Sequence, residues 1–142
     1  MAALTFLDSN VLLYQLDVNE GRKQELASAI VREAIASSRA CISFQVVQEV
    51  LNVVTRKAKR LLDEEDATIY LNDVLTPLMR VLPDAALYRR ALATQQRWRC
   101  SFYDSLIVAA ALQAGCKRLL TEDMQHGQVI DGLLVENPFL AA

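Results

Sequence analysis

Short, mainly apolar runs alternate along the chain with longer stretches in which apolar residues recur every three or four positions. The short runs are typical of buried strands, and we predict five, at residues 4–7, 40–43, 80–82, 117–121 and 133–136. The helical spacing predicts helices over residues 21–38, 63–79 and 84–98, and two more that begin after Ser43 and Ser101. Short strands separated by helices favour a parallel sheet with helices on both faces.

This alternation runs without an internal repeat, a linker or a low-complexity tract, and a chain of 142 residues fits one domain. We therefore predict an α/β fold in which residues 1–142 form a single domain. Its sheet is expected to be short, mostly parallel and five-stranded, with helices on both faces. Hydrophobic residues make up 53% of the sequence, which is enough for a sizeable core.

The sequence shows no targeting or membrane-spanning signal. Asp8 interrupts the N-terminal apolar stretch, and no basic residue precedes it. The longest uncharged run, residues 105–116, is 12 residues long, whereas a membrane helix needs about 20. We therefore expect a soluble, cytoplasmic protein with no membrane partner.

Three cysteines and a small net charge add little chemistry. Cys41, Cys100 and Cys116 are odd in number and far apart, without a CxxC pattern, so we interpret Cys41 and Cys116 as reduced core residues. The formal net charge is −2. Contact with a polyanion would therefore depend on a local basic patch.

Acidic side chains recur where the predicted strands end. Asp8 follows the first strand in TFLDSNVLLY, and Asp123 follows the strand at residues 117–121. Glu49 lies in the helix that leaves the second strand, and Asp104 lies in the first turn after Ser101. Ligands of such sheets bind outside the carboxyl ends of the strands, so we expect these four carboxylates to converge at one edge.

Each carboxylate also has an ordinary structural explanation. Asp104 fits a capping box with Ser101, Glu49 fits a solvated helical residue, and Asp123 fits a turn. Asp8 is harder to explain, because a charge in apolar surroundings is costly unless it is paired or metal-bound. Four neighbouring carboxylates repel one another unless a cation intervenes, and a set of oxygen ligands favours Mg²⁺ or Mn²⁺.

Four segments in order resemble the acidic elements of PIN-domain nucleases. FLDSNVLLY resembles their opening D-[ST]-N, and the other three elements are matched by SFQVVQEVLNVV, FYDSLIVAAAL and LLTEDM. The similarity spans nearly the whole chain, from Thr5 to Pro138. Within this family the chain resembles in particular the VapC-type toxins of bacterial VapBC toxin–antitoxin pairs.

The resemblance implies a Mg²⁺- or Mn²⁺-dependent endoribonuclease that hydrolyses RNA phosphodiester bonds with an activated water. The implied catalytic and metal-binding residues are Asp8, Glu49, Asp104 and Asp123. It also implies a homodimer and a small antitoxin partner.

Four further residues are implied to support this quartet. Asn10 and Thr121 match positions that hold it by hydrogen bonds, and Ser9 is placed to reach the metal shell or a phosphate. Gln125 stands where many members of the family carry a second acidic residue, which leaves the number of metal ions open.

Candidate RNA contacts come from two basic clusters and two aromatic residues. The clusters are Arg56, Lys57, Lys59 and Arg60, and Arg89, Arg90, Arg97 and Arg99, although such groups are more often solvated helix faces. Trp98 and Tyr103 flank the third acidic element and could stack on a base, although packing is their more usual role.

Two other interpretations remain open. In the first, a catalytically weak or inactive PIN domain acts as an RNA-binding or protein-binding module. In the second, a receiver-like or phosphatase-like domain uses an Asp as phosphoryl acceptor. The second calls for a D-x-D-x-T or for a Lys at the end of a late strand. Here Asn10 stands in the place of the second Asp, and Lys117 begins its strand instead of ending it.

Overall fold

The computed structural model describes residues 4–140. In this part of the chain six strands form one sheet in the order β3-β2-β1-β4-β6-β5. The strands are β1 (Leu4–Leu7), β2 (Ala40–Ser43), β3 (Met79–Val81), β4 (Cys116–Leu120), β5 (Val129–Ile130) and β6 (Leu133–Glu136). Every neighbouring pair is parallel except β5 and β6, so the predicted α/β architecture is confirmed.

The predicted number of five strands is wrong because it omits β5. This two-residue strand pairs antiparallel with β6 across a tight turn at Asp131 and Gly132, whose φ angles are 49° and 87°. Turns with positive φ at both central residues favour Asp-Gly and match the twist of a hairpin. The Asp-Gly pair is visible in the sequence, but two residues are too short for a strand pattern to stand out.

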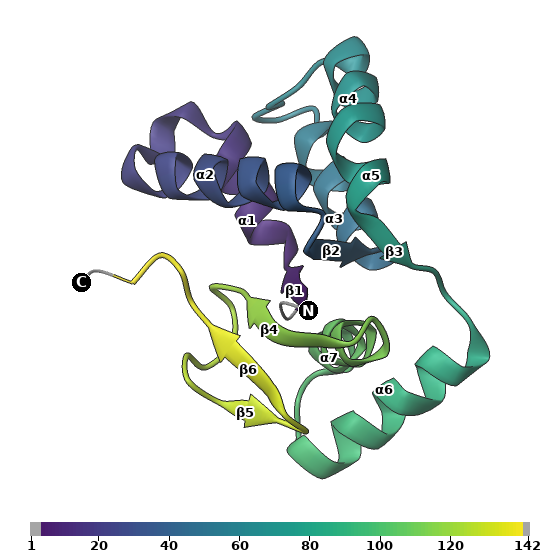
Figure 1. Cartoon of the computed structure of the whole chain (residues 1–142). Helices are drawn as coiled ribbons and strands as arrows, with labels where there is room; N and C mark the ends of the chain where they lie inside the picture. The colour runs from purple at the N-terminus through teal and green to yellow at the C-terminus, as the bar shows by residue number, and fades with distance from the viewer. Residues whose placement is uncertain (1–3, 141–142) are drawn as a thin grey trace.

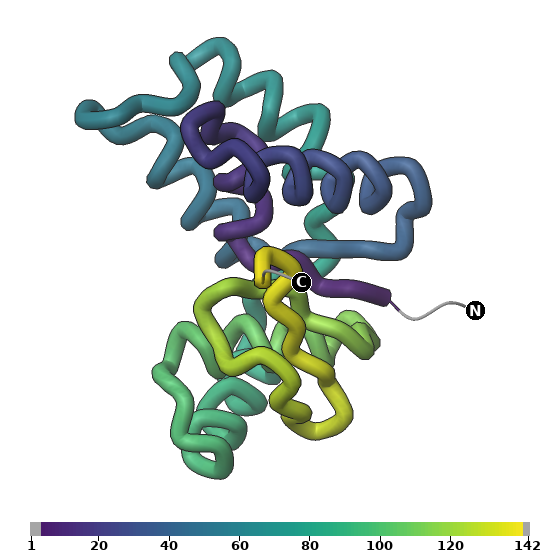
Figure 2. The backbone as a smooth tube through the Cα atoms, turned by 90° about the vertical axis from the view of Figure 1, so that its left-hand side faces the viewer, coloured from purple at the N-terminus to yellow at the C-terminus, as the bar shows by residue number. Residues whose placement is uncertain are grey.

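The helices cover the two faces of the sheet (Figure 1). On one face lie α1 (Ser9–Leu16), α2 (Arg22–Ser37), α3 (Phe44–Val54), α4 (Glu64–Tyr70) and α5 (Thr76–Leu78). On the other lie α6 (Ala85–Trp98) and α7 (Phe102–Gln113). Figure 2, turned by 90°, shows the purple-to-teal segments of α1 to α5 in the upper half and the green segments of α6 and α7 in the lower half. The predicted covering of both faces is therefore confirmed.

Helix α1 and the short 3₁₀ helix η1 (Val18–Glu20) were not predicted. Helix α1 has only eight residues, and an apolar run of that length does not separate helix from strand. The side chain of Asp8 begins the helix by accepting a hydrogen bond from Ser9 N at 2.8 Å. Asp8 thus directly follows the last residue of β1, and its carboxylate caps α1.

The predicted helix over residues 63–79 is helical but not regular. A π-helical turn, η2 (Leu71–Leu75), lies between α4 and α5. Pro77 follows it, and a proline in a helix lacks the amide donor and clashes with the carbonyl four residues earlier, which here belongs to Asp73. A widened turn before the proline accommodates that clash.

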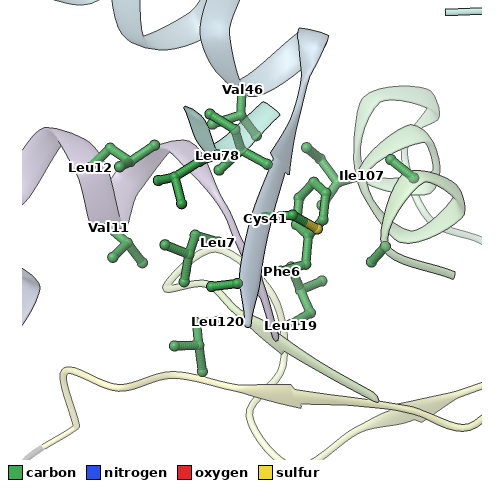
Figure 3. Close-up of a cluster of buried hydrophobic side chains, with 14 of the residues drawn as sticks. Phe6, Leu7, Val11, Leu12, Cys41, Val46, Leu78, Ile107, Leu119 and Leu120 are labelled. Atoms are coloured by element: carbon green, nitrogen blue, oxygen red, sulfur yellow. The ribbon is translucent and has the colours of Figure 1, made fainter. Parts of the chain in front are cut away.

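Alternating side chains of the central strands fill both layers of the core. In Figure 3, Leu7 lies on the side of Val11 and Leu12, whereas Phe6 and Cys41 lie toward Ile107 of α7. Cys41 and Cys116 are free and buried, with their Sγ atoms 3.6 Å apart, as their interpretation as reduced core residues predicts. Among the helices of residues 4–140, none is long and apolar enough to cross a membrane.

Candidate active site

Thr121 lies at the centre of a hydrogen-bond network at the carboxyl edge of the sheet. Its side chain is fully buried at the end of β4, beside β1. The hydroxyl donates to Asp8 Oδ2 at 2.8 Å and accepts from the backbone N–H of Asp123 at 3.1 Å. It also accepts from Asn10 Nδ2 at 3.2 Å. One buried oxygen therefore connects the ends of two strands and the start of α1.

Asn10 makes the second set of connections between these segments. Its Nδ2 donates to Asp123 Oδ2 at 3.2 Å, and its Oδ1 accepts from the backbone N–H of Glu122 at 3.2 Å. An Asn side chain has both donors and an acceptor, so it can hold a carboxylate and a backbone amide at once. The loop that carries Asp123 is consequently tied to α1.

Asp8 is the most buried of the four predicted carboxylates, with 6% of its surface exposed. Burial raises the pKa of Asp8 above its ordinary value, and the nearby carboxylates of Asp123 and Asp104 raise it further. The hydrogen bonds from Thr121 and from Ser9 N act in the opposite direction because they stabilise the charged form.

Glu49 and Asp104 join the site through their charge. Desolvation raises the pKa of Glu49 to about 7, together with the carboxylates of Asp8, Asp123 and Asp104. The side chain of Glu49 nevertheless reaches solvent on α3. Asp104 lies in the first turn of α7, where Ser101 Oγ caps its backbone N–H at 3.1 Å and leaves its carboxylate free of that role. The charges of Asp8, Asp104 and Asp123 therefore all act on Glu49, and those of Asp104 and Asp123 also act on Asp8.

This donor set fits a hard divalent cation. It consists of carboxylates with no His or Cys among them. Burial raises the pKa of Glu49 first, and the charges of the other three carboxylates, which a cation would offset, raise it further. Among residues 4–140, no three Asp, Glu, His or Cys side chains form a ready-made cage for an ion. Mg²⁺ is usually held by one or two carboxylates together with water and phosphate oxygens, so a full protein cage is not required.

A family model for the PIN domain matches residues 5–130. The chain belongs to the PIN-domain family. A search of curated proteins finds no significant match.

Solved structures share this PIN fold at low sequence identity. VapBC2 from Rickettsia felis, bound to a DNA fragment from its promoter, is 16% identical with a TM-score of 0.66 over 94% of this chain and 98% of that chain. FitAcB from Neisseria gonorrhoeae is 22% identical with a TM-score of 0.64, over 96% and 99% of the two chains. VapC20 from Mycobacterium tuberculosis, a toxin that cleaves the sarcin–ricin loop, is 18% identical with a TM-score of 0.58, over 81% and 86%.

The remaining predicted PIN residues take different places. Ser9 is buried at the start of α1, whereas Gln125 is exposed in the loop after β4. Tyr103 has 68% of its surface exposed next to Asp104, whereas Trp98 packs against the core. Packing against the core is therefore confirmed for Trp98, whereas Tyr103 does not pack in the core; packing of Tyr103 at an interface stays a prediction.

One buried polar residue near the PIN site escaped the sequence analysis. Gln45 is 4% exposed on α3, one turn before Glu49, and its Nε2 donates to the carbonyl of Tyr103 at 3.3 Å. It therefore links the helix of Glu49 to the helix of Asp104. Its position four residues before Glu49 places both on one helix face, which was the available signal.

Proposed function

We propose that this PIN domain is a ribonuclease that uses Asp8, Glu49, Asp104 and Asp123 to hold a divalent cation, Mg²⁺ or Mn²⁺. The observation that supports it best is that Thr121 and Asn10 bind Asp8 and Asp123 together at the carboxyl edge of the sheet. Beside them, burial and then the charges of the other three carboxylates raise the pKa of Glu49 to about 7. Carboxylates collected at one edge without a counter-charge are destabilising unless a cation is bound between them. A bound cation would supply a Lewis acid that activates water and offsets the charge of the scissile phosphate.

Cation binding, positioning of the carboxylates and proton transfer are assigned to different residues. Asp8 and Asp104 would hold the cation, and Thr121 and Asn10 would fix Asp8 and Asp123 through the hydrogen bonds described above. Glu49 would orient the attacking water and take its proton, since a base with a pKa near neutrality suits that step. Ser9 would contribute a hydroxyl oxygen, and Gln125 an amide oxygen, to the surroundings of the cation. Hydrolysis would leave a 5′-phosphate and a 3′-hydroxyl, without a covalent intermediate.

The proposal of RNA binding rests on exposed basic side chains and on one exposed aromatic ring. The residues from Arg56 to Arg60 and from Arg89 to Arg99 include eight basic side chains, all of them exposed. In residues 4–140 just one of the eight, Arg97, forms an ion pair, with Asp131 at 3.9 Å. The exposed ring of Tyr103 beside Asp104 is available to stack on a base.

We further propose that the protein is the toxin of a toxin–antitoxin pair and forms a homodimer. The support is the fold shared with structures described as toxin–antitoxin complexes. An apolar groove of about 400 Å³ between α3 and α4, lined by Leu51, Leu62 and Leu71 among others, offers a surface for a small antitoxin. Growth arrest on expression in bacteria, absent with Asp8→Asn, tests the toxin role, and light scattering tests the dimer.

Cleavage by the purified protein tests the nuclease. Unstructured RNA, structured RNA and a sarcin–ricin loop oligonucleotide are incubated with Mg²⁺, with Mn²⁺ and with EDTA. We expect metal-dependent cleavage that is lost in Asp8→Asn and Asp104→Asn and kept in Asp73→Asn, a matched control on the exposed side of η2. Equal cleavage by all variants would indicate a contaminant. Metal binding without cleavage of any RNA would favour the alternative of a non-catalytic binding module.

A further inference from the structure

Three polar side chains form a cluster beside the acidic site, which we call the Tyr14–Lys23–Glu122 cluster. Lys23 Nζ donates to Glu122 Oε2 at 2.6 Å and to Tyr14 Oη at 3.3 Å, and it lies 4.8 Å from the centroid of the Tyr14 ring. The Tyr14 hydroxyl donates to Glu122 Oε1. Both carboxylate oxygens of Glu122 are thus engaged by donors on other elements.

The cluster joins three separate elements. Tyr14 belongs to α1, Lys23 to α2, and Glu122 to the loop after β4. The C-terminal segment adds support, because the ring of Phe139 packs edge-on against Tyr14 at 4.9 Å and Arg22 donates to the Phe139 carbonyl at 2.9 Å. The loop is therefore held from the side of α2 as well as from the side of α1.

Glu122 immediately precedes Asp123, so its two anchors act on the same short loop. Its backbone N–H is bound by Asn10, and its side chain is bound by the cluster. A residue that is held at both its backbone amide and its side chain has little freedom to rotate. Because the peptide bond is planar, the orientations of the Glu122 carbonyl and of the Asp123 amide are restricted as well. Loss of the Glu122 side-chain anchor leaves only the bonds to Asn10 and Thr121 to hold Asp123.

A purely stabilising role explains this arrangement less well. Exposed ion pairs contribute little to stability, and the side chains of Lys23 and Glu122 are 34% and 26% exposed. Both carboxylate oxygens of Glu122 accept hydrogen bonds, whereas Asp123 accepts one at Oδ2 from Asn10. Within that dipeptide, Asp123 is therefore the residue with a carboxylate oxygen available for a cation.

We propose that Tyr14 and Lys23 are positioning residues, which hold Glu122 and thereby fix Asp123 in the geometry that binds the divalent cation. This inference rests on the proposed nuclease function. It assigns a role to Lys23, which lies outside the four acidic elements, and to Tyr14, the last residue of the first one.

Amide hydrogen exchange tests the positioning without any metal. In Lys23→Met and Glu122→Gln we expect the amides of Glu122 and Asp123 to exchange about five- to tenfold faster than in the parent protein, with the amides of α7 unchanged. Lys23→Arg should restore slow exchange, and Lys117→Met, at an exposed position of β4, is the matched control. Unchanged exchange in both test variants would overturn the proposal, and circular dichroism verifies that each variant is folded.

Mn²⁺ affinity, measured by electron paramagnetic resonance, separates positioning from simple charge. Charge alone would make Lys23→Met bind Mn²⁺ more tightly and Glu122→Gln more weakly, because the first removes a positive charge and the second a negative one. Positioning predicts about three- to tenfold weaker binding in both, and no further loss in the double variant. Tighter binding by Lys23→Met would therefore overturn it.

Failure of the nuclease proposal gives a different result. If the parent protein neither binds Mn²⁺ nor cleaves RNA, the proposed function and the metal role of the cluster fall together. The exchange rates then still decide whether the cluster holds the loop.

Discussion

Thr121→Val removes one oxygen from the middle of the acidic site and almost nothing else. Val has nearly the volume of Thr, so the substitution leaves no cavity at this fully buried position. The hydroxyl donates at 2.8 Å to the carboxylate of Asp8, which is 6% exposed, so water cannot readily replace the lost donor. A hydrogen bond to a charged group contributes about 1.5–3 kcal/mol.

The two bonds that Thr121 accepts add less, because Asn10 and Asp123 lie nearer to solvent and can bind water instead. We therefore expect Thr121→Val to lower the free energy of unfolding by about 2–3 kcal/mol at pH 7 in EDTA. Urea unfolding followed by circular dichroism measures it. Thr121→Ser is the matched control, since it keeps the oxygen and should lose only about 1 kcal/mol for its missing methyl group.

The effect of Thr121→Val should also depend on pH with a defined sign. The hydrogen bond lowers the pKa of Asp8 in the folded protein, against the stronger opposing effect of burial. Its contribution is therefore full while Asp8 is ionised and is lost as the pH falls and Asp8 is protonated. If the valine variant were no less stable than the serine variant at pH 7, the hydroxyl would not be holding the carboxylate.

Three further outcomes are expected. Glu49→Gln should stabilise the metal-free protein by about 1 kcal/mol at pH 8 and not at pH 4, as measured by urea unfolding. The pKa of Glu49 in the folded protein, about 7, is above its value in the unfolded chain, so ionisation of Glu49 destabilises the fold as the pH rises, and solvent exposure screens the effect. Mn²⁺ at a hundred times its dissociation constant should raise the free energy of unfolding by about 2.7 kcal/mol, and Asp8→Asn should abolish that gain. Leu119→Ala, at a fully buried position, should cost about 3–5 kcal/mol by the same method, and a loss below 1 kcal/mol would mean that this core collapses around the gap.

The sequence carried the larger pattern of the fold because burial repeats with the period of each element. Apolar runs located β1, β2 and β6, and the 3.6-residue spacing located α2 and α6 to within one or two residues. Short elements escaped, namely α1, η1 and β5, because a pattern of eight residues or fewer does not separate helix from strand. Their formation depends on partners that are distant in sequence, since β5 is a strand only because β6 pairs with it.

The acidic residues were identified from the sequence alone because their types and order are local properties. The residue types alone predict oxygen ligands for a cation, without any coordinates, at Asp8, Glu49, Asp104 and Asp123. What holds them is not local: Thr121 and Asp8 lie 113 residues apart in the chain and yet share a hydrogen bond of 2.8 Å. Only the adjacency of β1 and β4 in the sheet brings that pair together.

Beyond Asn10 and Thr121, which the sequence predicted, the tertiary structure alone decided which polar residues bind the acidic loop and helices. Lys23, Glu122 and Gln45 look like ordinary surface residues in the sequence, because nothing near them shows a partner. Their partners come from α1, α2, α7 and the loop after β4, which meet only after the sheet has formed. The sequence determined which chemical groups are available to this protein. The order of the strands determined which of these groups come within hydrogen-bond distance, because segments about a hundred residues apart in the chain must first be brought together by folding.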